Sequence, residues 1–129
     1  MEDYVTYKQA VELKELGFDW ECYTFYHWDN WCGLNHSGIC ENHNMFEKCI
    51  SAPTLAQAQK WLREKHRIHI QIEACMGHKW TYELVDTYCR QDITGEYISR
   101  IPERDSYPLI TTYEQALSEG ISKALELLK

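Results

Sequence analysis

Cysteine and histidine are the residues of this 129-residue chain whose spacing most suggests chemistry, and there are six of each. The densest group reads Cys-x3-His-x3-Cys-x2-His and consists of Cys32, His36, Cys40 and His43. Thiolate and imidazole are ligands that zinc prefers. Structural zinc sites, however, usually contain two cysteines about two to four residues apart, and this segment has no such pair. We favour no metal and expect no cofactor; if a metal is present, these four residues are its ligands.

Candidate catalytic groups are scattered through the chain. A thiol beside an imidazole can act as a nucleophile, but with six of each residue type some pair will be close by chance. The paired carboxylates, Glu12 with Glu15 and Glu103 with Asp105, fall where solvated charges are expected. We therefore name no catalytic residue, lean against an enzyme, and keep a small enzyme as the least favoured alternative.

Aromatic residues are crowded between positions 20 and 31. They are Trp20, Tyr23, Phe25, Tyr26, Trp28 and Trp31. This is more aromatic area than one small core buries easily, and tryptophan and tyrosine are enriched at interaction surfaces. We expect Trp28 and Trp31, next to a turn-rich stretch, to contact a protein partner or a second copy of the chain.

A basic cluster offers a candidate anion contact. Lys60, Arg63 and Arg67 form it, together with Lys65 and two neighbouring histidines. The whole chain, however, has 13 Lys and Arg against 20 Asp and Glu, a net charge of −7, which repels phosphate backbones. We expect the cluster to be a solvated helix flank and nucleic acid to be an unlikely partner; a zinc-binding or nucleic-acid-binding module remains an alternative.

Three helices are predicted, and each opens on a threonine with Gln or Glu three residues later, the pattern of a capping box. The pairs are Thr6 with Gln9, Thr54 with Gln57, and Thr111 or Thr112 with Glu114 or Gln115. The helices are expected over residues 7–16, 55–65 and 113 to the end, with Gly17 ending the first.

Strands are predicted from alternation of apolar and polar residues. Residues 68–74 alternate at period two, and a short loop leads to a return over 80–84, which predicts an antiparallel hairpin. Its buried face should carry Ile68, Ile70 and Ile72. The opposite face should show His69, Gln71, Glu73, Thr81 and Glu83.

A second hairpin is predicted from residues 21–27 and 45–50, which flank a turn-rich stretch over 29–44. Residues 87–108 show no pattern and are expected to form a long loop, with a short strand near Tyr97.

These elements predict the α+β class in the order α-β-β-α-β-β-α, with an antiparallel sheet of two hairpins and helices packed on one face. We expect a single domain over residues 1–129. One core should contain Trp61, Leu62, Ile68, Ile70, Ile72, Leu117 and Ile121.

The chain also resembles a group of small uncharacterised proteins encoded by gut anaerobic bacteria and their phages or prophages. The residues concerned are Ala-Pro-Thr at 52–54, Lys-Trp-Leu-Arg-Glu at 60–64, the segments 68–70 and 80–82, and the Tyr-Glu helix from 113. The resemblance covers most of residues 46–129 and implies a cytoplasmic, mobile-element origin. It implies no activity and no site residue.

The N-terminal residues lack the basic and apolar regions of an export signal, and no apolar run approaches the roughly 18 residues that span a bilayer. We expect a cytoplasmic protein with reduced thiols and no membrane contact. The expected function is that of a small, non-enzymatic protein-interaction module of phage or mobile-element type.

Overall fold

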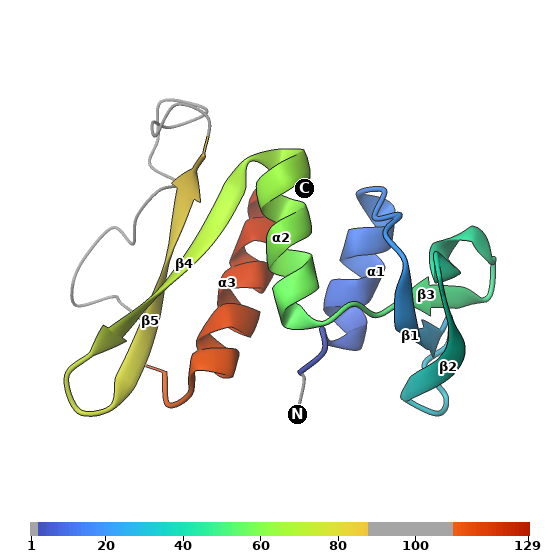
Figure 1. Cartoon of the computed structure of the whole chain (residues 1–129), viewed down its shortest axis with the longest axis horizontal. Coiled ribbons are helices and arrows are strands. Elements are labelled where there is room, and N and C mark those ends of the chain that lie inside the picture. The colour runs from blue at the N-terminus through green and yellow to red at the C-terminus, as the bar shows by residue number, and fades with distance from the viewer. Residues whose placement is uncertain (1–2, 88–109) are drawn as a thin grey trace. The chain divides into compact units, whose positions relative to one another are not determined.

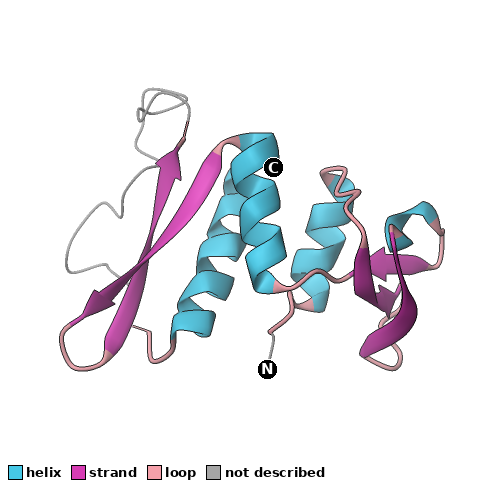
Figure 2. Cartoon of the chain, in the orientation of Figure 1, coloured by secondary structure: helices cyan, strands magenta, loops and turns pink. Residues whose placement is uncertain are grey.

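The computed structural model describes residues 3–87 and 110–129 and confirms the α+β class. Its elements are α1 (Tyr7–Glu15), β1 (Cys22–His27), β2 (Leu34–Glu41), the 3-10 turn η1 (His43–Met45), β3 (Cys49–Ser51), α2 (Leu55–His66), β4 (Ile68–Cys75), β5 (Lys79–Asp86) and α3 (Tyr113–Leu127) (Figures 1 and 2). The observed order is therefore α-β-β-β-α-β-β-α, with one strand more than expected.

The described strands form two antiparallel sheets where one was expected. The first has the order β2-β1-β3 and the second consists of β4 and β5. Contacts divide the chain into two compact units, residues 1–58 and 59–129, and each unit contains one of the sheets. The single domain over 1–129 stays a prediction.

The first sheet corrects the predicted hairpin of residues 21–27 and 45–50. The stretch 29–44, expected to be a turn, contains β2, which pairs along one side of β1. Part of the expected partner, β3, pairs along the other side, with Tyr26 opposite Ile50. Every residue of β2 is exposed or half-buried, so its sequence lacks the alternation that a strand with one buried face would show.

Helix α1 begins and ends as predicted. The Thr6 hydroxyl accepts from the Gln9 amide at 3.2 Å, while the Gln9 side chain accepts from the Thr6 amide at 2.9 Å, so the capping box is complete. After the last turn, Gly17 takes a φ of 94°, a conformation that favours glycine. The buried apolar residues of the 1–58 unit are Val5, Ala10, Leu13, Phe18, Cys22, Ile50, Ala52, Leu55 and Ala58.

In the 59–129 unit, β4 and β5 form the predicted hairpin through the turn at Met76–His78, and α3 packs against the face that carries Ile70. The Gln59 side chain of α2 donates to the Ile70 carbonyl at 2.6 Å. Six of the seven predicted core residues are buried, and Ile72 is half-buried. The core of this unit was therefore predictable from its apolar spacing.

Thr81 was predicted to be exposed, but it is buried, with 2% of its surface accessible. It pairs with Glu73, as expected for the face opposite Ile70. Beside it, the backbones of Trp80 and Ile110 exchange hydrogen bonds of 2.7 and 2.8 Å. This edge of β5 is therefore joined by a distant segment, which the alternation of the hairpin itself does not reveal.

The predicted loop over 87–108, with its strand near Tyr97, falls almost entirely outside the described residues. Within residues 3–87 and 110–129, no helix is both long and apolar enough to cross a lipid bilayer.

Candidate interaction site and other candidate groups

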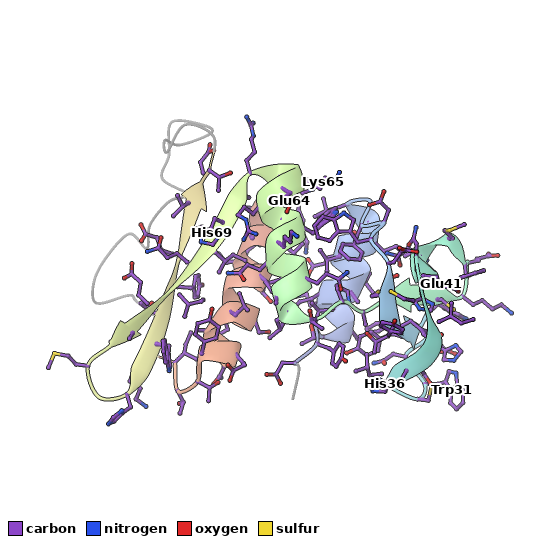
Figure 3. All side chains as sticks on the ribbon, in the orientation of Figure 1. Trp31, His36, Glu41, Glu64, Lys65 and His69 are labelled. Atoms are coloured by element: carbon purple, nitrogen blue, oxygen red, sulfur yellow. The ribbon has the colours of Figure 1, made fainter. Side chains whose placement is uncertain are left out.

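Residues 28–33 join β1 to β2 and carry the two tryptophans singled out in the sequence; we call this segment the tryptophan turn. Trp28 is 58% exposed and Trp31 is 72% exposed. Asn30 and Gly33 have positive φ angles of 53° and 74°, so the chain reverses tightly between the strands. Figure 3 shows the Trp31 side chain directed away from the ribbon.

Three hydrogen bonds fix the backbone of the tryptophan turn, two to other segments and one within the turn. The Tyr7 hydroxyl of α1 donates to the carbonyl of Trp28. The Trp28 amide donates to the Lys48 carbonyl at 3.0 Å, and the Trp31 amide donates to Oδ1 of Asp29 at 3.3 Å. Two large exposed rings are thus presented on a backbone that is already ordered before any partner binds.

A row of rings runs from the interior of the first sheet to the tryptophan turn. His43 stacks on Phe25 with a centroid distance of 4.8 Å, Phe25 meets His27 at 5.7 Å, and His27 meets Trp31 at 5.6 Å. His43 is buried and Trp31 is exposed. Through these contacts the exposed Trp31 ring is connected to the buried His43 ring, which restrains the position of Trp31.

Three other aromatic residues of this crowded stretch, Trp20, Phe25 and Tyr26, are half-buried and pack against neighbouring rings. The Tyr26 hydroxyl donates to the Val5 carbonyl at 2.8 Å, and its ring meets Tyr7 edge to face at 5.6 Å. Trp20 is half-buried beside Phe18. Exposed large apolar residues in the 1–58 unit, besides the two tryptophans, are Tyr23, Ile39, Met45 and Phe46.

The four predicted metal ligands do not come together. Cys32 is exposed, with its thiol 3.2 Å from the Asn35 side-chain amide; His36 is exposed and its ring packs against Tyr4. Cys40 is exposed, whereas His43 is buried in the ring row. Among residues 3–87 and 110–129, no group of three or more Cys, His, Asp or Glu side chains is placed to hold a metal ion.

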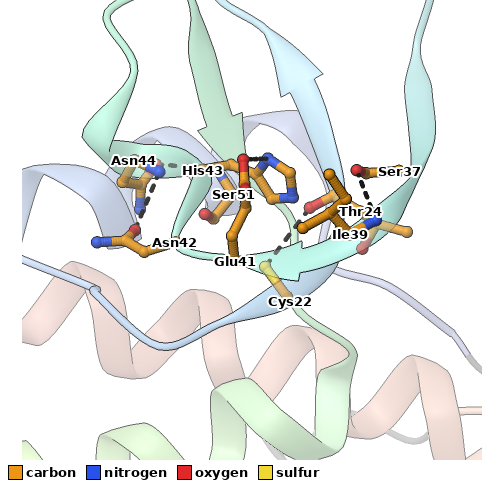
Figure 4. A network of polar contacts seen from close by, with 9 residues as sticks. All are labelled: Cys22, Thr24, Ser37, Ile39, Glu41, Asn42, His43, Asn44 and Ser51. Atoms are coloured by element: carbon orange, nitrogen blue, oxygen red, sulfur yellow. Dashed lines mark hydrogen bonds and ion pairs between the residues drawn. The ribbon is translucent and has the colours of Figure 1, made fainter.

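Glu41, His43 and Ser51 form a cluster that has the residue types of a hydrolase triad (Figure 4). Nδ1 of His43 lies 3.9 Å from Oε1 of Glu41. Ser51, however, has no accessible surface and His43 only 4%, so a substrate cannot reach a nucleophile here. The Ser51 amide instead donates to the Asn44 side chain at 2.8 Å, which ties β3 to η1. The bond shown for Ser51 here is therefore structural, and no sequence motif predicted this group of residues.

Cys22 and Cys40 line a cavity of about 220 Å³ in the 1–58 unit. The other lining residues are Tyr4, Glu21, Tyr23, Thr24, Thr54 and Gln57. Burial raises the pKa of the Cys22 thiol, which keeps it protonated and a poor nucleophile at neutral pH. The five described cysteines are free thiols, and Cys89 lies outside the described residues.

In the predicted anion cluster of Lys60, Arg63 and Arg67, the first two residues interact with side chains close to them in the sequence. Lys60 pairs with Glu64 at 3.8 Å on the exposed side of α2, and the His66 ring packs against Trp61 at 4.9 Å. Arg63 is close enough to His69 that its charge contributes to lowering the pKa of that imidazole (Figure 3 labels Glu64, Lys65 and His69).

The last turn of α2 contains Arg63, Lys65 and His66, where cations interact favourably with the helix dipole. Arg67 follows in a left-handed conformation, with a φ of 60°, where α2 gives way to β4. These cations therefore lie where α2 ends and its dipole is negative.

No protein-family model, curated protein or solved structure matches this chain. The geometry of the described residues is therefore what bears on function.

Proposed function

We propose that this protein is a non-enzymatic protein-interaction module that contacts its partner through the tryptophan turn. The observation that supports this proposal is the exposure of Trp28 and Trp31, at 58% and 72%, on a backbone fixed by Tyr7 and Lys48. Indole rings provide large contact areas at low entropic cost and dominate the binding energy of many interfaces. Two of them on an ordered turn are typical of an interaction site.

The described cysteines, histidines and carboxylates give less support to the other classes. The Glu41, His43 and Ser51 cluster is closed to substrate, and burial keeps the Cys22 thiol protonated. A zinc-binding or nucleic-acid-binding module and a small enzyme remain alternatives. The cytoplasmic location and the mobile-element origin implied by the resemblance stay predictions.

The test compares three tagged forms of the chain in affinity purification with quantitative mass spectrometry. They are the wild type, a Trp28→Ala, Trp31→Ala double variant and a Tyr23→Ala control. Tyr23 is a matched control because it lies on β1 and is 59% exposed, almost the same as Trp28. Thermal unfolding must first show that all three forms are folded.

We expect the wild type and Tyr23→Ala to recover the same partner and the double variant to lose it. Sedimentation velocity of the same three forms detects the case in which the partner is a second copy of the chain. Recovery of the same proteins by the double variant, with unchanged sedimentation, would contradict the proposal.

A further inference from the structure

The tryptophan turn belongs to the more acidic unit of the chain. Residues 1–58 contain nine Asp and Glu but only three Lys and no Arg, whereas residues 59–129 contain eleven acidic and ten basic residues. One of the three lysines, Lys14, directs its ammonium group to the carbonyls of Cys49 and Phe46, at 2.8 and 3.4 Å. The surface of this unit therefore has a negative potential that attracts cations.

Two exposed carboxylates belong to the tryptophan turn or to the segment that its backbone binds. Asp29 stands between Trp28 and Trp31 in the chain, and its bond to the Trp31 amide fixes one carboxylate oxygen within the turn. Glu47 precedes Lys48, whose carbonyl accepts the hydrogen bond from the Trp28 amide. The carboxylate of Asp29 is thus part of the turn itself, whereas the opposite charges of Glu47 and Lys48 stand at the segment that its backbone binds.

This combination favours a cationic ligand over an anionic or a purely apolar one. The face of an indole ring is electronegative and binds ammonium or guanidinium groups by cation–π interaction, and the neighbouring carboxylates add to that attraction. An apolar partner that covered both tryptophans would desolvate the carboxylate of Asp29 without pairing it, which is costly. Arginine fits best because its planar guanidinium both stacks on rings and pairs with carboxylates.

We propose that the partner of the tryptophan turn presents an arginine-rich cationic segment, with guanidinium groups against Trp28 and Trp31 and near Asp29. This inference rests on the proposed function and names the chemistry of the partner.

The test uses short peptides in which glycine alternates with arginine, lysine, citrulline or glutamate. Citrulline is the decisive control because it has nearly the shape of arginine without its charge. The indole N–H signals in the NMR spectrum, assigned with single Trp→Phe variants, report which rings the peptide touches. We expect the arginine peptide to shift the signals of Trp28 and Trp31 while those of Trp61 and Trp80 stay in place.

We expect calorimetry to show that the citrulline peptide binds about tenfold more weakly or not at all, and that sodium chloride weakens the binding of the arginine peptide. Each of the Trp28→Ala and Trp31→Ala variants should lose about three- to fivefold in affinity. The Tyr23→Ala variant should lose none.

The Asp29→Asn variant separates charge from structure, because the amide oxygen of asparagine still accepts the Trp31 amide hydrogen bond. Together with Glu47→Gln it should weaken arginine-peptide binding about three- to fivefold without changing the melting temperature. Equal binding of the arginine and citrulline peptides, or shifts that spare Trp28 and Trp31, would overturn the inference.

These outcomes are distinguishable from failure of the proposed function. If cationic peptides do not bind but the Trp28→Ala, Trp31→Ala variant still loses its partner in affinity purification, only the cationic chemistry is wrong. If the double variant keeps every partner, the proposed function itself is wrong, whatever the peptides do.

Discussion

Gly120 of α3 faces the β4–β5 hairpin with no room for a side chain. A Cβ atom at this position would lie 2.5 Å from Cγ2 of Ile70 and 3.4 Å from Cγ of Tyr82. Ile70 is completely buried, so its side chain has little freedom to move aside. The φ of Gly120 is not in the left-handed region, so its backbone conformation does not require glycine. Glycine is needed here because the hairpin packs too closely for a side chain.

We therefore expect Gly120→Ala to lower the free energy of unfolding by about 1 kcal/mol or more, because overpacking outweighs the helix propensity that alanine gains. Ile70→Ala alone should cost about 2 to 5 kcal/mol. In the Ile70→Ala background the clash is gone, so Gly120→Ala should be neutral or stabilising. Urea unfolding of the two single variants and the double variant measures this coupling; additive losses would contradict the packing.

His66 and His69 make stability depend on pH. Burial lowers the pKa of His66, and burial together with the charge of Arg63 lowers the pKa of His69. Because the folded state disfavours the protonated imidazoles, the unfolded chain binds these protons first as the pH falls. The stability that the neutral imidazoles provide is thus present above the unfolded value of about 6.5 and is lost as the pH drops through the lowered folded values.

We expect the midpoint of urea unfolding to decrease between about pH 7 and pH 5. The Arg63→Gln variant removes the positive charge that helps to lower the pKa of His69. The unfolding midpoint of this variant should therefore decrease less over the same pH range. A midpoint that is constant or rises on acidification would show that these imidazoles are not desolvated in the folded state.

At the scale of the elements, α1 begins with the capping box of Thr6 and Gln9, which the sequence predicts. The hydroxyl of Thr54 likewise accepts from the Gln57 amide at 3.1 Å, but the Gln57 side chain donates to the carbonyl of Glu21 at 2.8 Å. Thr112 caps α3 in the same way, by accepting from the Gln115 amide. Each helix thus starts at the threonine that caps it. The bond from the Gln57 side chain to the Glu21 carbonyl, in contrast, depends on the tertiary structure.

Thr6→Ala should destabilise the chain by about 1 kcal/mol, since it removes the acceptor for the Gln9 amide at the first turn of α1. Thr6→Ser keeps a hydroxyl at this position and should restore most of the loss. Thermal or urea unfolding measures both variants. Equal losses for alanine and serine would show that the methyl group, and not the cap, provides the stability.

Across the chain, the two units each have a sheet and buried apolar residues, and neither gathers the cysteines and histidines into a metal site among the described residues. Cys32, His36 and Cys40 are exposed, and His43 is packed against Phe25.

We expect a chelator to leave the melting temperature unchanged and elemental analysis of purified protein to find less than stoichiometric zinc. One equivalent of zinc per chain, or a large drop in melting temperature with chelator, would contradict this expectation. In that case Cys32, His36, Cys40 and His43 are the residues to substitute.

The features predictable from the sequence depend on residues a few positions apart. The cap at Thr6, the hairpin from Ile68 and the apolar spacing of α3 are local patterns, so the helices, β4, β5 and most of the second core follow from them. The candidate site was predictable from an excess of aromatic residues together with the position of Trp28 and Trp31 beside a turn-rich stretch, but the pattern does not say how the other rings are covered.

Contacts between distant residues decided the rest. Strand β2 is held by its backbone pairing with β1 while its side chains are largely exposed, so it carries no clear pattern. His43 is buried because it stacks on Phe25, and Thr81 is buried beside the pairing of Trp80 with Ile110. Trp28 and Trp31 are exposed while Tyr26 packs, although all three are close in the sequence. Burial depends on which segments meet in space, and residue type and local spacing do not specify that.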